Sequence, residues 1–123
     1  MKDIHLGEIE SRFADIIWQN EPLASAELST LAEKALGWKK TTSYTVLKRL
    51  CDKGIFTNDK GTVKSIISRE NFYSVKSEKF VDDTFGGSLP AFLAAFTRSK
   101  GLSAREVDEI RCLIDKYGEN NND

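Results

Sequence analysis

Apolar residues recur every three or four positions in the first third of the chain, which is the spacing of helices that bury one face. The first repeat predicts a helix over residues 8–20, ended by a proline soon afterwards. A second repeat predicts a helix with Ser25 as its N-cap and Gly37 as its stop, preceded by a very short strand at residues 23–24. A third helix follows almost at once, over residues 38–54. Two helices joined by so short a turn are typical of a helix-turn-helix motif.

The helix over residues 38–54 has two faces of different composition. At about 100° per residue, Val46, Leu47 and Leu50 share one side with Ser43. The other side carries hydroxyls, an aromatic ring and a cation, on Thr41, Tyr44, Thr45 and Lys48. Further hydroxyl and cationic side chains flank that side, on Lys39, Lys40, Thr42 and Arg49. This mixture suits contacts to phosphates and base edges, so we predict one packing face and one nucleic-acid-binding face.

Alternation replaces the helical pattern after this helix. Two β-prone runs, over residues 55–59 and 63–68, flank a glycine-containing loop and predict a hairpin. Three helices followed by a hairpin is the winged-helix order. The hairpin tip would then carry Lys60 and Lys64 towards the DNA backbone or minor groove, whereas a hairpin that only stabilises the three-helix core is the plainer alternative.

From about Glu70 the chain becomes rich in phenylalanine and returns to helical spacing. Gly86-Gly87 breaks the first of these helices, and Ser88 or Leu89 opens the next. Ser103 and Glu106 form a capping box for the last. The predicted fold class is therefore mainly α with a small β hairpin: a winged helix-turn-helix DNA-binding domain over residues 1–70 and a C-terminal helical dimerisation arm over residues 71–123.

About fifty residues in three short helices are too few to bury so many aromatic side chains among themselves. A second copy of the chain is the simplest cover, since soluble monomers avoid large apolar patches; folding back on the N-terminal domain is the alternative. The predicted dimer interface comprises Phe80, Phe85, Leu89, Phe92, Leu93, Phe96, Ile110, Leu113 and Ile114.

The formal net charge of −1 over 123 residues hides an uneven distribution. Residues 34–64 hold eight basic and two acidic side chains, a net charge of +6, and the remainder holds ten basic and seventeen acidic, a net charge of −7. The cations thus concentrate on the third helix and the hairpin, as in nucleic-acid-binding domains, although a solvated lysine-rich helix gives a similar count.

Other classes of protein find little support in the composition. No apolar run approaches the roughly 20 residues of a membrane span, and the N-terminus lacks a signal-peptide pattern, so we expect a cytoplasmic protein without membrane insertion.

Cys51 and Cys112 lie far apart in apolar helical patterns and are expected to be reduced core residues. The single histidine, His5, has no neighbouring ligand set, so neither a metal nor another cofactor is expected.

Catalysis is also disfavoured. The chain has no glycine-rich phosphate loop and no plausible nucleophile–base pair, and the adjacent acidic residues at 82–83 and 108–109 point in different directions on helices. The competing class is a winged-helix module that binds proteins without specific DNA binding. Such a module would not need cations on both the third helix and the hairpin.

The chain resembles the penicillinase-repressor family, the BlaI/MecI/CopY repressors of bacteria, over nearly its whole length. The resemblance rests on the order and spacing of several segments: the helix from Glu8 to Trp18 ending I-I-W, the run W-K-K-T-T-S-Y-T-V-L-K-R-L-C-D-K-G, the hairpin, V-K-S at 75–77 and L-S-x-x-E at 102–106. It implies a winged-helix domain with a helical dimerisation arm, and repression of resistance or copper-homeostasis genes through dyad-symmetric operators.

The resemblance also implies roles for single residues. The DNA-reading positions of the family fall on Thr41, Thr42, Tyr44 and Thr45, and its candidate phosphate contacts on Lys39, Lys40, Lys48 and Arg49. Ser43 departs from the branched apolar residue usual at its position. Several of these residues also belong to the contacting face selected by helical periodicity.

Two regulatory features of the family are altered here. Some members are released when a sensor-protease signalling system leads to cleavage of an Asn-Phe bond in the arm, and the corresponding pair is Ala95-Phe96, which lacks the asparagine. The copper-responsive branch binds metal through closely spaced C-terminal cysteines, and only Cys112 lies in that region, so copper sensing by that route is disfavoured. The inducing signal stays open.

Overall fold

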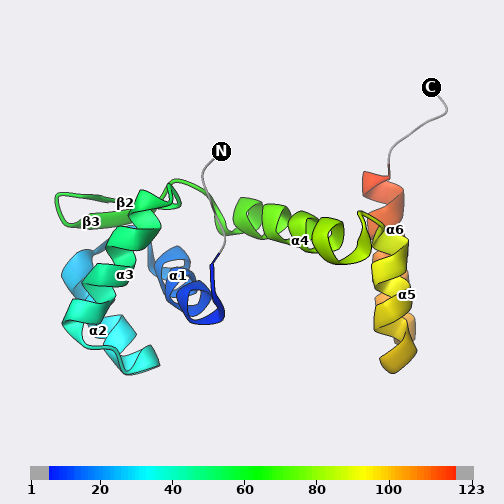
Figure 1. The fold of residues 1–123 in the computed structure, drawn as a ribbon, viewed down its shortest axis with the longest axis horizontal. Coiled ribbons are helices and arrows are strands. Elements are labelled where there is room, and N and C mark those ends of the chain that lie inside the picture. Colours follow the sequence, from blue (N-terminus) through cyan, green and yellow to red (C-terminus); the bar gives the residue numbers. More distant parts are fainter. Residues whose placement is uncertain (1–5, 119–123) are drawn as a thin grey trace. The chain divides into compact units, whose positions relative to one another are not determined.

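The computed structural model describes residues 6–118, and His5 lies outside them (Figure 1). In this part of the chain the elements are, in order, α1 (Glu8–Asn20), β1 (Leu23–Ala24), α2 (Ser25–Leu36), α3 (Lys40–Asp52), β2 (Phe56–Asp59), β3 (Thr62–Ser65), α4 (Arg69–Phe85), α5 (Leu89–Ser99) and α6 (Ala104–Tyr117). The chain divides into two compact units between Ser77 and Glu78. This division falls within α4.

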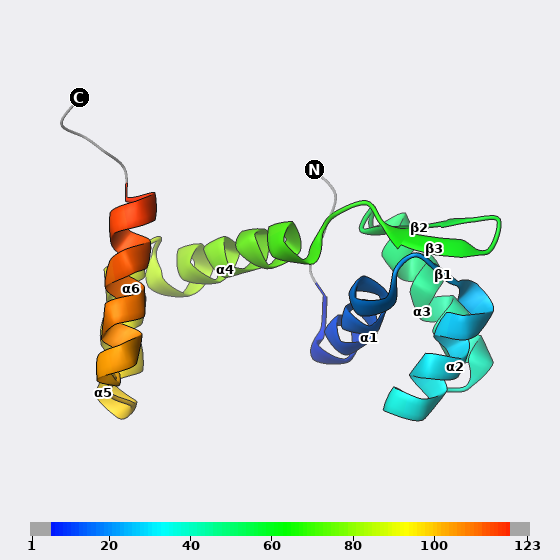
Figure 2. The same cartoon turned by 180° about the vertical axis from the view of Figure 1, so that it is seen from behind.

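The first unit has the predicted winged-helix fold. Three helices pack with an antiparallel sheet of strand order β1-β3-β2, which is seen from behind in Figure 2. Phe56 pairs with Ser65 and Asp59 with Thr62, so β2 and β3 form the expected hairpin. The short strand before α2 also exists, and it pairs Leu23 with Val63. The wing is therefore attached to the helices through its pairing with β1 as well as through its covalent connections to α3 and α4.

The core of the first unit gathers the apolar side of each helix. Its largest fully buried side chains include Phe13 of α1, Leu28 of α2, Leu50 of α3 and Phe56 of β2. A fully buried side chain of this size contributes about 1.5–3 kcal/mol relative to its exposed state. This packing fixes which side of each helix remains in solvent.

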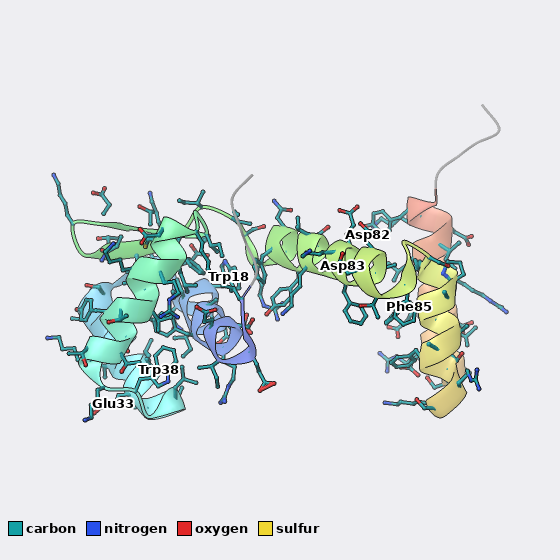
Figure 3. The ribbon with its side chains drawn as sticks, viewed as in Figure 1. Trp18, Glu33, Trp38, Asp82, Asp83 and Phe85 are labelled. Carbon is teal, nitrogen blue, oxygen red and sulfur yellow. The ribbon has the colours of Figure 1, made fainter. Side chains whose placement is uncertain are left out.

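Both tryptophans help to close this core and are labelled in Figure 3. The Trp18 ring lies 5.1 Å from that of Phe56 and 5.4 Å from that of Phe72, and its Nε1–H donates to Ile67 O at 3.0 Å. The ring centroid of Trp38 lies 5.0 Å from that of Phe13. Phe72 is fully buried, so the first turns of α4 belong to the first unit, beyond the boundary at residue 70 predicted from the sequence.

Two local predictions were wrong, and long-range pairing explains both. Ser25 is not the N-cap of α2: Ala24 occupies that position, because it is extended in β1, and Ser25 is the first helical residue. The last strand ends at Ser65 instead of residue 68. It ends early because the N–H groups of Ile66 and Ile67 both donate to Ile55 O, at 2.8 and 3.2 Å.

The second unit comprises the end of α4 with α5 and α6, and its local signals are confirmed. Ser88 caps α5 by accepting from Ala91 N–H. Ser103 Oγ accepts from Glu106 N–H at 3.0 Å, and Glu106 Oε1 accepts from Ser103 N–H at 2.9 Å, which completes the capping box of α6. The prediction that Cys112 is a core residue was wrong: it is exposed, because α6 has no buried residue in the described structure.

Ser43 is a polar side chain in the middle of the packing face of α3. It is 3% exposed, and its hydroxyl has no hydrogen-bond partner in the described structure. A buried hydroxyl without a partner costs about 1–3 kcal/mol. Its position among Val46, Leu47 and Leu50 therefore makes it a weak point of an otherwise apolar stripe.

We expect Ser43→Ala to raise the free energy of unfolding by about 1 kcal/mol, because it removes an unpaired buried hydroxyl and improves helix propensity. Urea unfolding followed by tryptophan fluorescence reports on this unit, which contains both tryptophans. Ser74→Ala, at an exposed position of α4, measures the propensity gain alone. A loss of stability in Ser43→Ala would mean that the hydroxyl has a partner.

Candidate nucleic-acid interface

The turn between α2 and α3 sets the direction of α3. Gly37 has φ of +70°, a left-handed conformation that suits glycine, and its N–H donates to Glu33 O at 3.0 Å. This closes the end of α2 as predicted, and α3 begins at Lys40. The two helices thus form the helix-turn-helix motif within the three-helix core.

The two faces of α3 are as predicted from periodicity. Val46, Leu47 and Leu50 are buried, and Thr41, Thr42, Thr45 and Lys48 are exposed. The Thr45 hydroxyl donates to Thr41 O at 2.9 Å, a helical back-bond that leaves its oxygen free to accept. The outer face of α3 therefore offers a row of short polar side chains to solvent.

Tyr44 differs from its neighbours, because it is only half-exposed. Its hydroxyl donates to Ser25 Oγ at 3.3 Å, and Lys40 Nζ lies 5.9 Å from its ring centroid. The ring consequently lies on the side of α3 towards the start of α2. Periodicity identified Tyr44 as part of the polar side, but it gave no sign of the contact with Ser25.

The cations of α3 fall into two groups. Lys39 and Lys40 are exposed near its first turn, and Lys48 Nζ lies 3.3 Å from Asp52 in a solvent-exposed pair of little energetic weight. Arg49 instead makes an ion pair with Glu10 of α1, at 3.1 Å, and Lys53 lies 3.8 Å from the same carboxylate. Among the predicted phosphate contacts, Arg49 thus has a partly buried carboxylate partner on another helix, whereas Lys48 has an exposed partner on its own helix.

Glu10 joins the start of α1 to the end of α3. Partial burial acts to raise the pKa of Glu10, but hydrogen bonds from Gly7 N–H and Arg49, with the charges of Lys53 and Arg49, hold this pKa below its usual value. The carboxylate is therefore ionised at neutral pH. This pair could not be predicted from the sequence, because residues 39 positions apart in the chain give no local signal.

The wing places its two lysines on an exposed hairpin. Lys60 and Gly61 form the turn with φ of +52° and +89°, and Asn58 Oδ1 accepts from Gly61 N–H at 3.0 Å. Lys64 is exposed on β3, beside the buried Val63. Neither Lys60 nor Lys64 makes an ion pair within residues 6–118, so both charges face solvent.

A shallow hollow separates α3 from β2. It is lined by Tyr44, Leu47, Lys48, Cys51, Phe56, Thr57, Asn58 and Ile66. Cys51 is half-buried there, and burial together with Asp52 raises the pKa of its thiol. The thiol is therefore protonated at neutral pH, which suits packing and not nucleophilic chemistry.

The predicted dimer-interface residues all lie in the second unit. The ring of Phe92 contacts those of Phe80, Phe85 and Phe96, with centroids 6.1, 5.6 and 6.2 Å away, so the four form one aromatic cluster. No residue from 78 to 118 is buried, and several large apolar side chains are 43–60% exposed: Phe80, Leu89, Phe96, Leu113 and Ile114. Leu93 and Ile110 are half-exposed.

The Ala95–Phe96 bond lies inside α5, where both residues are exposed. Phe96 O accepts from Lys100 N–H at 3.2 Å, and the Phe96 ring contacts Phe92. This bond is thus held in regular helix and attached to the aromatic cluster. A protease that binds extended chain would need this turn to unwind.

Acidic pairs and metal-ligand groups offer no alternative centre in the described residues. Asp82 and Asp83 are exposed and are labelled with Phe85 in Figure 3, and Asp83 pairs with Lys79 at 2.9 Å. No group of three or more histidine, cysteine or acidic side chains in residues 6–118 is arranged to hold a metal ion. None of the helices in that range combines the length and apolar character of a bilayer span.

Comparison with known proteins identifies relatives that align with nearly the whole chain. The Penicillinase repressor of Bacillus licheniformis is 25% identical over 122 residues, which is 95% of each chain. The Methicillin resistance regulatory protein MecI of Staphylococcus aureus (strain Mu50) is 21% identical over 119 residues, covering 94% of this chain and 97% of that protein. MecI of Staphylococcus epidermidis is 20% identical with the same coverage.

A family model described as penicillinase repressor matches residues 6–116. This match spans both units and so confirms the resemblance seen in the sequence motifs. The chain therefore belongs to the penicillinase repressor family, whose members are DNA-binding transcriptional repressors and not enzymes.

Proposed function

We propose that the chain is a homodimeric repressor that binds a dyad-symmetric operator with α3 and the wing of each subunit. The observation that carries this proposal is the division of α3 into a buried apolar stripe and an exposed polar face. The polar face lies on a helix-turn-helix motif followed by a wing with two solvent-facing lysines. These are the elements with which such proteins contact duplex DNA.

In this proposal α3 enters the major groove. Thr41, Thr42 and Thr45 are short hydroxyl side chains that can reach base edges, and threonine can bond either donors or acceptors there. Lys39, Lys40 and Lys48 would neutralise phosphates on either side of the groove. Arg49 contributes less than these lysines, because its guanidinium is paired with Glu10.

The wing would contact the backbone or the minor groove through Lys60 and Lys64. Lys60 has a positive φ, a conformation that costs a side chain other than glycine or asparagine about 1 kcal/mol or more. Asparagine or glycine would suit this turn position better. The presence of a lysine at this strained position supports a use for its charge.

The second unit would supply the dimer interface. Its aromatic cluster and the apolar face of α6 leave phenylalanine, leucine and isoleucine side chains exposed, and no residue of the unit is buried within the described part of the chain. A self-complementary twofold contact would cover them. The two α3 helices would then bind half-sites separated by about one turn of the DNA helix, or by a multiple of it.

The regulated genes are proposed from the relatives. Those reported above are named for penicillinase and methicillin resistance, which favours antibiotic-resistance genes over metal-homeostasis genes as targets. The operator itself can be obtained by in vitro selection from a random-sequence duplex library. The duplex recovered in this way is called the selected duplex below.

We expect Thr45→Ala to weaken binding to the selected duplex by about 1–3 kcal/mol for each base contact that it removes, with little change on a random duplex. Fluorescence anisotropy titrations at fixed salt measure both affinities. Thr30→Ala is a matched control, because the Thr30 hydroxyl also donates to the carbonyl four residues earlier but lies on α2. Equal losses on both duplexes would remove Thr45 from the base contacts.

Lys60→Asn should weaken binding to selected and random duplexes alike, and should reduce the salt slope by about 0.9 for each phosphate that the lysine neutralises. Asparagine suits the positive φ of this turn, so stability should not fall. Lys100→Asn makes the same charge change in the second unit and should leave the salt slope unchanged. A weakening confined to the selected duplex would contradict a phosphate contact.

Phe96→Asp should give monomers with weak operator affinity, because it places a charge among the apolar residues of the proposed interface. Analytical ultracentrifugation measures the oligomeric state, and circular dichroism verifies that the helices persist. Ala94→Asp is the control, because Ala94 is exposed and lies about 200° around α5 from Phe96. An unchanged dimer in Phe96→Asp would exclude this residue from the interface.

Failure of the wild-type chain to bind any duplex at low salt would contradict the proposal as a whole. That result would favour the alternative function, a winged-helix module that binds only proteins. DNA binding at low salt distinguishes the two functions, because a module that binds only proteins has no need of solvent-facing lysines on the wing.

A further inference from the structure

Ser25 contacts both parts of the proposed DNA-binding surface. Its N–H donates to Gly61 O in the wing loop, at 2.8 Å. Its hydroxyl oxygen accepts from the hydroxyl of Tyr44 on α3, at 3.3 Å. One residue thus joins the wing to α3, with its backbone on one side and its side chain on the other.

The contact with the wing belongs to a short run of pairings. Ala24 pairs with Thr62 in the β1–β3 ladder, and the Ser25 N–H extends this ladder to the turn. Glu21 holds the other end of β3, because its carboxylate accepts from Ser65 N–H at 2.7 Å and from Ser65 Oγ at 3.0 Å. The wing is therefore held at both ends of β3 by residues 21–25, which end in the first residue of α2.

The contact with α3 fixes an aromatic ring within the polar face. Tyr44 follows Thr41 by about one turn and precedes Thr45 and Lys48, so its ring borders the side chains proposed to read bases. Anchoring the hydroxyl at one end of the ring selects one ring position out of several rotamers. Lys40 Nζ lies 5.9 Å from the centroid of this ring, within the range of a cation–π contact.

The Ser25 hydroxyl has no role in capping its own helix. Ala24 is the N-cap, and no side chain caps α2. Alanine has a higher helix propensity than serine, so removal of this hydroxyl does not weaken α2. A loss of DNA binding on this removal would therefore not come from a weaker α2.

We infer that Ser25 is a positioning residue for DNA binding: its hydroxyl orients Tyr44 on α3, and its N–H holds the wing loop at Gly61. This inference rests on the proposed function, because it assumes that α3 and the wing both contact DNA. It adds a link between the two, because Ser25 contacts α3 with its side chain and the wing loop with its backbone.

A double-mutant cycle on the full chain tests whether the Ser25 hydroxyl orients Tyr44. We expect Ser25→Ala and Tyr44→Phe each to lower affinity for the selected duplex by about threefold to tenfold, the range of one hydrogen bond. The double variant should be no weaker than the weaker single variant, because both remove the same contact. In these variants the affinity for a random duplex should change by less than about twofold. The control variant Ser25→Thr keeps a hydroxyl and should bind the selected duplex as tightly as the wild type does.

Ser25→Pro tests whether the Ser25 N–H holds the wing loop at Gly61. Ser25 is the first residue of α2 and the preceding Ala24 is extended, so proline fits there and removes the N–H. Compared with Ser25→Ala, it should weaken binding a further few-fold on selected and random duplexes alike and show a smaller salt slope, because the lysines of the wing are released. Circular dichroism verifies that α2 is retained.

Three outcomes would overturn the inference: Ser25→Ala binding as tightly as the wild type, losses that add fully in the double variant, or Ser25→Pro indistinguishable from Ser25→Ala. These outcomes leave the proposed function intact if the wild type still prefers the selected duplex. If the wild type shows no preference for the selected duplex, the proposed function fails first, and the inference fails with it.

Discussion

The packing of the apolar stripe of α3 against the core is the interaction on which the rest of the first unit depends. Val46, Leu47 and Leu50 are at most 7% exposed, and each buried side chain contributes about 1.5–3 kcal/mol. The exposed Lys48–Asp52 pair contributes at most about 1 kcal/mol, so it cannot set the rotation of the helix. The apolar stripe sets it, and the threonines face solvent as a consequence.

Polar contacts between elements then determine how the exposed parts are arranged. Glu10 links α1 to Arg49 and Lys53, Glu21 holds Ser65, and Ser25 joins α3 to the wing. A single hydrogen bond contributes only about 0.5–1.5 kcal/mol, too little to decide the fold. Such a bond is directional, however, so it can select one position of a wing or a ring among several that the core would accept.

In the second unit, local contacts are well formed but tertiary burial is small. Its helices have well-formed caps, as at Ser88 and Ser103, and its four phenylalanine rings contact one another, but no residue from 78 to 118 is buried. Local hydrogen bonds can define short helices, yet isolated helices of this length are marginal without tertiary packing. The apolar surface that remains exposed is the physical reason for proposing a second subunit.

The sequence by itself determined the helices, the hairpin, the two faces of α3 and the caps at Gly37 and Ser103, since these follow from backbone geometry and donors within about one turn. Only the tertiary structure decided the contacts of Ser25, the pairing of Arg49 and the exposure of Cys112. Ser25 and Tyr44 are 19 residues apart and Arg49 and Glu10 are 39 apart, and no periodic pattern encodes a partner at such separations. Those contacts depend on how the packed helices meet, which is a property of the whole core.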